Sequence, residues 1–351
     1  MSKKIIIIGS GLSGLSLAYF LRNQNISVQI IEANDRLGGR IFTKESHNTK
    51  VELGATWLWN YNVGLKTLCS ELNINLFEQQ MDGYALFEAM NSVGPQKFEL
   101  PKNQEVSYRI EGGSSTIIKK LAAHISSDDI HLKERVTKIT DVNDTVKVTT
   151  NLSEYITDFV VTTIPPKLLV NSIDFKPHLP EKVFSIANNT HTWMKDAIKF
   201  AVIYKKPFWK ESKLSGVCFS HVGPFTELYD HSDKHENYFS LMGFMNSNLY
   251  QLTKEQRKNL IIKQLVKFFG KQANDFQSYE EKVWKLESLT CFNNQFNENP
   301  HQNNGHPVYQ KSFFNGKLFL GGTETCENFP GYMEGCVLRS IEISKKLKEL
   351  V

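Results

Sequence analysis

A glycine-rich turn near the N-terminus constrains the fold of this chain more than any other feature. The isoleucines Ile5–Ile8 form a short apolar, β-branched run, as expected for a parallel strand that is buried on both faces. The pattern G-x-G-x-x-G follows at residues 9–14, and a helical pattern runs from about Leu12 to Arg22. A second apolar run, Ser27–Ile31, ends at Glu32. This order predicts a βαβ unit that binds a dinucleotide.

Each part of this unit has a physical task. Gly9 makes the tight turn, Gly11 lets a pyrophosphate approach the backbone, and Gly14 lets the helix pack closely on the strand. The helix N-terminus offers free N–H groups to phosphate, and Glu32 accepts hydrogen bonds from ribose hydroxyls. A glycine-rich turn without a ligand is the alternative, but the flanking strand, helix and acid count against it. The expected contacts of the dinucleotide are Gly9, Ser10, Gly11, Leu12, Ser13, Gly14, Glu32 and Ala33.

The segment D-R-L-G-G-R at residues 35–40 extends this unit in a way that dehydrogenases using only nicotinamide do not need. It resembles the second half of the FAD-binding signature of the flavin-containing amine oxidase superfamily. In that superfamily the arginines meet phosphates, and the paired glycines let the chain pass close to the cofactor. The resemblance implies that Arg36, Gly39 and Arg40 contact FAD.

Composition excludes several other classes of function. The 351 residues are enough for two joined domains, with 40% hydrophobic and 22% charged residues. No apolar run approaches the ~20 residues that span a bilayer, so no membrane partner is expected. The net charge of +4 is too mild and too scattered to favour nucleic acid.

The positions of the cysteines and histidines argue against disulfide bonds and metal sites. The five cysteines are scattered without a C-x-x-C pair, which indicates reduced thiols in a cytoplasmic protein. The ten histidines form no ligand pattern, so no metal site is expected. The sequence leaves a monomer and a homodimer equally open.

The resemblance implies an α/β fold: a Rossmann-type FAD-binding domain with an interleaved, reduced α+β substrate domain. FAD-binding parts are expected at residues 1–72, 108–166 and 286–351, and substrate-domain parts at 73–107 and 167–285. In larger members of the superfamily a long helical insertion follows residue 72, whereas only a few tens of residues are available here. A short member with a small substrate compartment is therefore expected.

Further family segments place more of the flavin contacts. Residues 51–60, VELGATWLWN, resemble the G-G-x-W segment beside the flavin, which implies contacts from Ala55, Thr56 and Trp57. Trp59 is expected to be a core aromatic residue. In relatives, a valine at the position of Val136 contacts the adenine edge through its backbone.

A lysine lies inside an apolar strand pattern at residues 193–209. Alternation places Lys199, Ala201 and Ile203 on one face and apolar residues on the other. In amine oxidases the strand that ends in P-F-W carries a lysine that hydrogen-bonds a water at flavin N5, and the resemblance assigns that role to Lys199. Lys195 is the alternative if the register slips, and an edge strand with Lys199 reaching solvent is the plainer interpretation.

The segment GGTETCENFPGYMEG at residues 321–335 closely resembles the C-terminal signature of monoamine and polyamine oxidases. The resemblance implies that Glu324 and Met333 bind the cofactor and that Tyr332 presents its ring to the substrate. Gly331 and Gly335 would let the helix start approach the flavin. No cysteine lies between Cys291 and Cys326, where covalent enzymes attach the flavin, so FAD is expected to be non-covalent. His306 is more readily explained as a loop-stabilising residue than as a catalytic one.

Together these segments imply an FAD-dependent oxidoreductase with Lys199 and Tyr332 as its catalytic residues. The expected reaction oxidises a small amine to an imine, with oxygen as electron acceptor and peroxide as product. A renalase-like oxidation of dihydronicotinamides, or a C–C desaturation or isomerisation on the same fold, is the alternative. A flavin-binding module without turnover is a third hypothesis. Substrate identity is left open, because the region that sets it is shortened.

Overall fold

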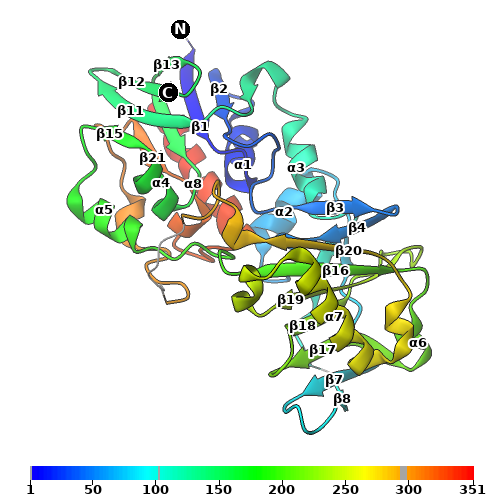
Figure 1. Ribbon diagram of the computed structural model, residues 1–351. Coiled ribbons are helices and arrows are strands. Elements are labelled where there is room, and N and C mark those ends of the chain that lie inside the picture. The colour runs from blue at the N-terminus through cyan, green and yellow to red at the C-terminus, as the bar shows by residue number, and fades with distance from the viewer. Residues whose placement is uncertain (1, 102, 293–298) are drawn as a thin grey trace.

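The computed structural model describes residues 2–101, 103–292 and 299–351, and it has two lobes (Figure 1). One lobe contains both chain ends and a five-stranded sheet, and the other contains a seven-stranded sheet. The chain passes between the lobes several times, so neither lobe is one continuous segment. The mixed α/β architecture that the sequence predicts is confirmed.

The five-stranded sheet is parallel throughout and has the order β10-β2-β1-β14-β21. Its central strand consists of the apolar run that precedes the glycine turn. Buried β-branched residues fill these strands because helices or further strands cover both faces. The strands are β1 Lys3–Ile8, β2 Ile26–Ile31, β10 Ile130–His131, β14 Phe159–Thr162 and β21 Leu318–Leu320.

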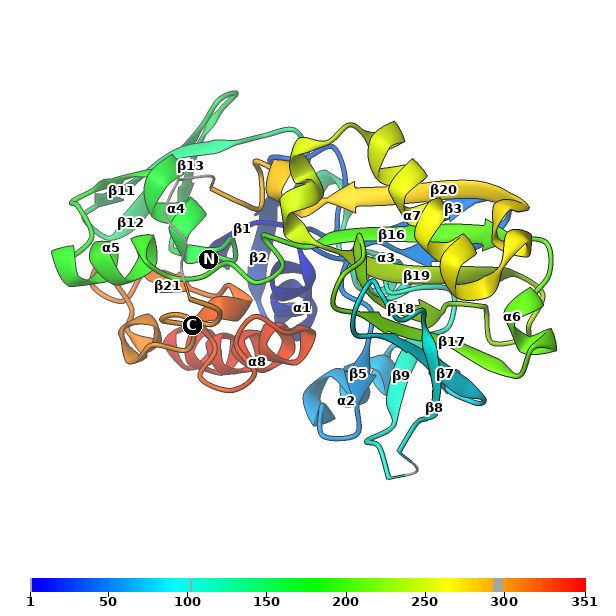
Figure 2. The same ribbon diagram turned by 60° about the horizontal axis from the view of Figure 1, so that its bottom comes forward.

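Four helices share the hydrophobic core on one face of this sheet. The first helix and the C-terminal helix lie side by side although they are far apart in sequence (Figures 1 and 2). Their shared core includes Leu15, Leu17, Val337 and Ile343. The helices are α1 Leu12–Leu21, α2 Val63–Glu71, α3 Ser115–Ala122 and α8 Met333–Leu350.

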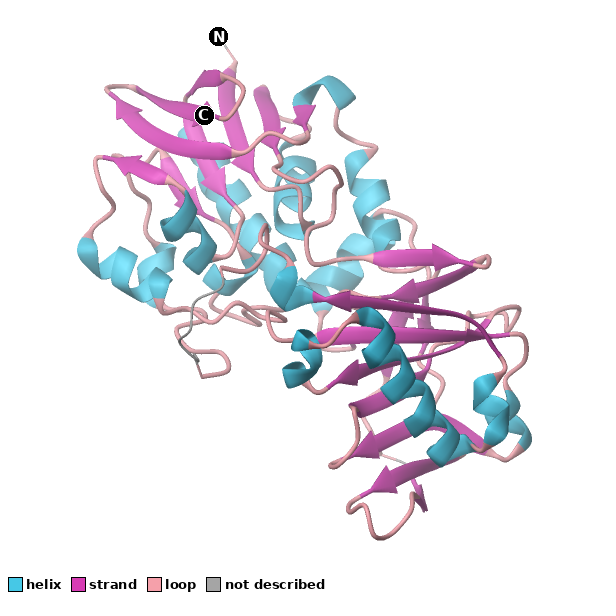
Figure 3. Cartoon of the chain, in the orientation of Figure 1, coloured by secondary structure: helices cyan, strands magenta, loops and turns pink. Residues whose placement is uncertain are grey.

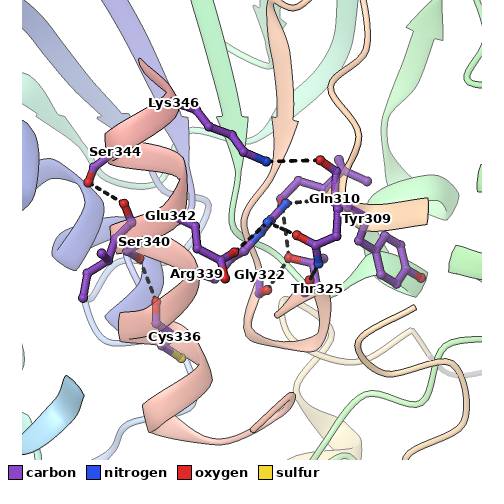
Figure 4. Close-up of polar contacts among 12 residues, drawn as sticks. Tyr309, Gln310, Gly322, Thr325, Cys336, Arg339, Ser340, Glu342, Ser344 and Lys346 are labelled. Atoms are coloured by element: carbon purple, nitrogen blue, oxygen red, sulfur yellow. Dashed lines mark hydrogen bonds and ion pairs between the residues drawn. The ribbon is translucent and has the colours of Figure 1, made fainter. Parts of the chain in front are cut away.

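Buried polar contacts of Arg339 fix α8 to the end of β21 (Figure 4). Its Nη2 donates to the carbonyls of Tyr309 at 2.6 Å and Leu320 at 3.0 Å, and its Nη1 donates to the Gln310 side chain and to Glu342. Gln310 in turn donates to the carbonyl of Thr325 at 2.9 Å. These contacts hold the N-terminus of α8 in place relative to the sheet.

The second face of the parallel sheet is covered by a mixed four-stranded sheet and two helices. This corrects the domain boundary expected at residue 167, because β15 pairs with β11 and α4 and α5 join the core of the nucleotide lobe. The chain enters the second lobe only after α5. Pro166 begins α4 directly after Pro165, whose backbone is extended. The elements are β11 Val136–Val142, β12 Thr145–Thr150, β13 Glu154–Thr157, β15 Asp174–Lys176, α4 Pro166–Ser172 and α5 Glu181–Asn188.

The second lobe is built on a seven-stranded sheet with the order β20-β16-β19-β18-β17-β7-β8, and helix α7 packs on one of its faces (Figure 3). The segment 73–107 therefore supplies β7 and the edge strand β8 to this sheet rather than a separate unit. The elements are β7 Tyr84–Glu88, β8 Gln96–Glu99, β16 Ile198–Tyr204, α6 Phe208–Glu211, β17 Leu214–Ser220, β18 Phe225–Asp230, β19 Phe239–Met245, α7 Lys254–Phe269 and β20 Phe276–Val283.

Small sheets join the two lobes. The hairpin of β3 and β4 packs its buried Val51 against Ala201 and Met242 of the seven-stranded sheet. Ser114 occupies the N-cap position of α3 without a capping hydrogen bond, and Trp284 lies in a short 3-10 helix after β20. The remaining strands are β3 Thr43–Ser46, β4 Thr49–Glu52, β5 Leu58–Trp59, β6 Leu76–Glu78 and β9 Ser107–Ile110.

Candidate functional site

A cavity of about 960 Å³ lies where the two lobes meet. Its wall includes the glycine turn after β1, the start of α8 and the face of β16 that carries Lys199. This volume is at the upper end of the range typical of sites for small molecules and cofactors. The two segments that most resemble a flavin signature, some 300 residues apart in sequence, are therefore brought to one cavity.

The glycine turn fits a pyrophosphate. Gly9 has φ +103, and a Cβ there would lie 2.8 Å from Thr163 Oγ1. At Gly11 a Cβ would meet no protein atom closer than 4.0 Å, so this backbone is bare toward the cavity. No side chain caps the N-terminus of α1, which leaves its first-turn N–H groups for an anion. The turn can thus hold the phosphates of FAD.

Glu32 is fixed at the end of β2 by three hydrogen bonds. Its Oε2 accepts from the backbone N and the Oγ of Ser10 at 2.8 and 2.7 Å, and its Oε1 accepts from the backbone N of Asn34 at 2.7 Å. The carboxylate lines the cavity and keeps lone pairs free for a ribose.

Most of the other predicted contact residues also reach the cavity wall. Val136 lies on the nucleotide side, and Trp57 lies beside Lys199. The predicted residues on the wall are Gly9, Gly11, Leu12, Ser13, Glu32, Ala33, Gly39, Arg40, Ala55, Thr56, Trp57, Val136, Lys199, Tyr332 and Met333.

Four predicted contact residues lie behind the wall instead. Ser10 orients Glu32, and Gly14 serves packing, because a Cβ there would lie 2.0 Å from the carbonyl oxygen of Gly9. The guanidinium of Arg36 donates to the carbonyls of Leu37, Gly39 and Ile41, so it braces its own loop. The fourth residue, Glu324, is fully buried and does not line the cavity.

Glu324 forms a paired ion bridge with Arg40, at 2.5 Å between Nη1 and Oε1 and 3.0 Å between Nη2 and Oε2. Both side chains also bond the backbone of Trp193. Burial opposes the charge on Arg40, but Glu324 outweighs it and raises the pKa of Arg40. Glu324 therefore positions an arginine that lines the cavity, and the prediction that Glu324 itself binds the cofactor is corrected.

Lys199 is 1% exposed and belongs to a strand that lies between two others, so it is not an edge residue that reaches solvent. Its Nζ donates to the carbonyl of Gly54 at 2.8 Å and to Thr56 Oγ1 at 2.6 Å. Nζ also lies 5.2 and 5.0 Å from the ring centroids of Trp57 and Phe244. Burial lowers the pKa of Lys199 to about 7, although Glu52 acts in the opposite direction.

The alternative residue, Lys195, also lines the cavity, but from the turn that precedes β16. Lys199 has the fixed strand position that the family pattern implies, and the predicted alternation is confirmed. Ile198, Phe200 and Val202 join the core on the opposite face of the sheet.

Aromatic rings surround Tyr332 at the start of α8. The rings of Tyr332 and Trp193 are 5.1 Å apart, and Trp193 stacks on His301 at 4.5 Å. Trp193 and Tyr332 line the cavity. His306 does not line it, and its Nδ1 accepts from the backbone N of Val308. The histidine beside Tyr332 is thus His301.

Several residues of the wall carry no functional signal in the sequence. Trp59 is not a core residue: it lines the cavity and stacks on Tyr61, which stacks on Phe329. Glu227 and Tyr229 line the wall from β18, and the Tyr229 hydroxyl donates to Glu227 at 2.9 Å. Among the other residues of the wall, Trp193 has one recognisable feature in the sequence: it is an aromatic residue in a polar turn.

The N-terminus of α8 faces the cavity through Met333 and Glu334. Glu334 does not cap its own helix but accepts from the backbone N of Gly64 and Leu65 at the start of α2. Gly331 lines the cavity with φ +90, whereas a Cβ at Gly335 would lie 2.3 Å from the carbonyl oxygen of Phe329. Gly335 is therefore required for helix packing and does not itself reach the cavity.

Two further observations concern the described residues as a whole. No group of three or more His, Cys, Asp or Glu side chains among them is arranged to hold a metal ion. No helix in this part of the chain combines the length and apolar character that crossing a bilayer requires.

Comparison with known proteins gives two family matches. The sequence pattern described as "Flavin containing amine oxidoreductase" matches residues 81–346, and "NAD(P)-binding Rossmann-like domain" matches residues 7–72. Among curated proteins, a probable flavin-containing monoamine oxidase A of Dictyostelium discoideum is 22% identical, covering 98% of this chain and 97% of the relative. Flavin-containing amine oxidase B of Mus musculus is 23% identical, covering 96% and 85%.

Solved structures show the same fold. A putrescine oxidase structure with bound putrescine superposes with a TM-score of 0.86 at 18% identity, covering 99% of both chains. Cyclohexylamine oxidase from Brevibacterium oxydans gives 0.85 at 18%, covering 99% of this chain and all of that one. The Dictyostelium alignment extends over 449 positions against 351 residues here, so the relative carries insertions that this chain lacks.

Proposed function

This chain belongs to the flavin containing amine oxidoreductase family, whose enzymes depend on FAD, and we propose that it oxidises a small amine to an imine with oxygen as electron acceptor and peroxide as product. The observation that carries this proposal is Lys199, a buried lysine that lines the same cavity as the glycine turn and Tyr332. The relatives named for monoamine, putrescine and cyclohexylamine oxidation support an amine as the substrate.

The nucleotide side of the cavity would hold the cofactor. Glu32 would bind the ribose, and the bare backbone at Gly11 together with the N-terminus of α1 would bind the pyrophosphate. Arg40 would be held in place for this purpose by Glu324. Bound FAD supplies the two-electron acceptor, and the protein supplies orientation and electrostatics.

The aromatic side of the cavity would bind the amine in its neutral form. Tyr332 and Trp193 offer ring faces, and apolar surroundings favour an uncharged amine over an ammonium ion. Lys199 would hold a water molecule or assist oxygen reduction, since its lowered pKa lets it exchange a proton near neutral pH.

A peroxide-coupled screen of the purified yellow protein tests this function. We expect primary and secondary amines to yield peroxide and to bleach the flavin under anaerobic conditions, while dihydronicotinamides do neither. Bleaching by dihydronicotinamides alone would replace the proposed reaction with the renalase-like alternative. A bound flavin that no small donor reduces would support a binding module instead.

A further inference from the structure

A second cavity, of about 480 Å³, meets the main cavity at Thr56, which lines both. Its inner wall is lined by four buried residues: Glu52, Arg109, Ser114 and His231. Its rim is formed by exposed residues that include Lys50 and His235, so it opens to solvent. No motif of the sequence indicates this cavity.

Three buried polar atoms of this cavity have no hydrogen-bond partner among the described residues: Glu52 Oε2, Arg109 Nε and Ser114 Oγ. Their residues are 3%, 5% and 1% exposed. Buried polar groups almost always bond to protein or to ordered water. Water occupies a buried cavity when there is room for it and when several polar groups can bond to it. This cavity meets both conditions.

The other atoms of these residues are firmly held. Glu52 Oε1 accepts from the backbone N of Ser114 and from Thr43 Oγ1, both at 2.8 Å. The Nη1 of Arg109 lies 2.7 Å from His231 Nδ1, and its Nη2 donates to the carbonyl of Ser232. Glu52 Oε2 and Arg109 Nε are therefore fixed in direction by the bonds of the other atoms in each group.

Lys199 reaches this second cavity through one contact. Its Nζ donates to Thr56 Oγ1 at 2.6 Å, and Thr56 is part of the second wall. Burial raises the pKa of Glu52, while the bonds from Ser114 and Thr43 and the charge of Lys199 favour its ionised form. The charge of Glu52 in turn favours the protonated lysine, while Arg109 disfavours it. The Thr56 hydroxyl thus joins the lysine to a cavity that Glu52 also lines and whose rim faces solvent.

We propose that the second cavity is a water-filled conduit through which Lys199 exchanges protons with solvent, and that Glu52 is a positioning residue that holds the proton on Lys199. This inference rests on the proposed function. Removal of two electrons from an amine to give an imine releases two protons, and reduction of oxygen to peroxide by those electrons takes up two. Release and uptake belong to successive half-reactions, so a route that is separate from the substrate cavity would carry protons out during the first and back during the second.

The other charged groups around Lys199 do not replace Glu52. Burial, together with Arg109 and Lys199, lowers the pKa of His231 well below its ordinary value, so this imidazole stays neutral. Lys282 lies opposite Lys199 on β20, and its ammonium pairs with Glu287. Phe244 faces Lys199 from β19.

The test measures the pKa of Lys199 directly in the FAD-bound enzyme. Nitrogen-15 at Nζ of the lysines is followed by NMR against pH, and the signal of Lys199 is the one absent from Lys199→Met. In Glu52→Gln, which keeps the hydrogen bonds of Oε1, we expect this pKa to fall by about one unit or more. Glu45→Gln, at the exposed rim of the same cavity, is the control and should not change it.

A crystal structure of the unmodified enzyme with FAD provides the second arm and needs no variant. We expect water bonded to Glu52 Oε2 and Arg109 Nε, continuing to Thr56 Oγ1. A dry cavity, or an unchanged Lys199 pKa in folded Glu52→Gln, would overturn the proposal. Neither readout uses a substrate, so failure of the amine screen alone would refute the proposed function and leave this result intact.

Discussion

The glycine turn and the surroundings of Lys199 both line the main cavity, but they are built in different ways. The turn is a run of neighbouring residues, 9–14, whose bare backbone at Gly11 would bind the cofactor. The Lys199 region brings together side chains from the loop after β4, from β16 and from β19. The first is thus a local structure, and the second exists only when the two lobes are assembled.

The two regions should therefore tolerate different kinds of substitution. A backbone site fails when a side-chain atom is added, because there is no room for it. A side-chain site fails when a functional group is removed, even if the fold persists. Three substitutions test this distinction.

Gly14→Ala should have the largest effect, because its Cβ would lie 2.0 Å from the carbonyl oxygen of Gly9. The turn must then shift, and we expect the FAD bound after desalting to fall at least about tenfold. Flavin absorbance per protein measures this. Gly94→Ala is the control, since a Cβ there meets nothing within 4 Å. Full FAD content in Gly14→Ala would show that the turn is not the local, close-packed site described.

Lys199→Met should keep FAD bound but slow the reaction of the reduced enzyme with oxygen by about 10- to 100-fold. The substitution removes the buried ammonium while retaining a similar apolar stem. Stopped-flow reoxidation measures this, and anaerobic reduction by an amine should change less. Lys195→Met, which alters a second lysine of the wall, is the control. Unchanged reoxidation would remove the role proposed for Lys199.

Glu324→Ala should have the smallest effect on chemistry and a clear effect on stability, because Glu324 joins the two regions through Arg40 and Trp193. It leaves Arg40 largely buried without its partner, and we expect the free energy of unfolding to fall by about 3 kcal/mol. Urea unfolding measures this. Glu324→Gln, which retains an acceptor, should lose less. Equal losses in both variants would mean that the charge of Glu324 does not matter.

The sequence predicts the nucleotide lobe well because its signals are local. The run Ile5–Ile8, the spacing of glycines and Glu32 fall where the structure has β1, the turn and the end of β2. Alternation around Lys199 also predicts the buried face of β16 correctly. In both cases the periodicity of one element contains the information.

The sequence fails where the partner of a residue is distant. Glu324 resembles a cofactor ligand in its motif, but its carboxylate faces Arg40, which lies 284 residues away. Residues 167–188 look like the start of the substrate domain, but the pairing of β15 with β11 places them in the nucleotide lobe. Neither pairing can be recognised from the residues next to it in the sequence.

The sequence by itself determined the glycine turn, the buried lysine strand and the family of the chain, because each depends on the order and spacing of nearby residues. Tertiary structure alone decided which groups meet Lys199, which aromatic rings surround Tyr332, and that a second polar cavity reaches Thr56. The physical reason is that these contacts join separate elements. Their geometry is fixed by the packing of two lobes rather than by the period of any one strand or helix.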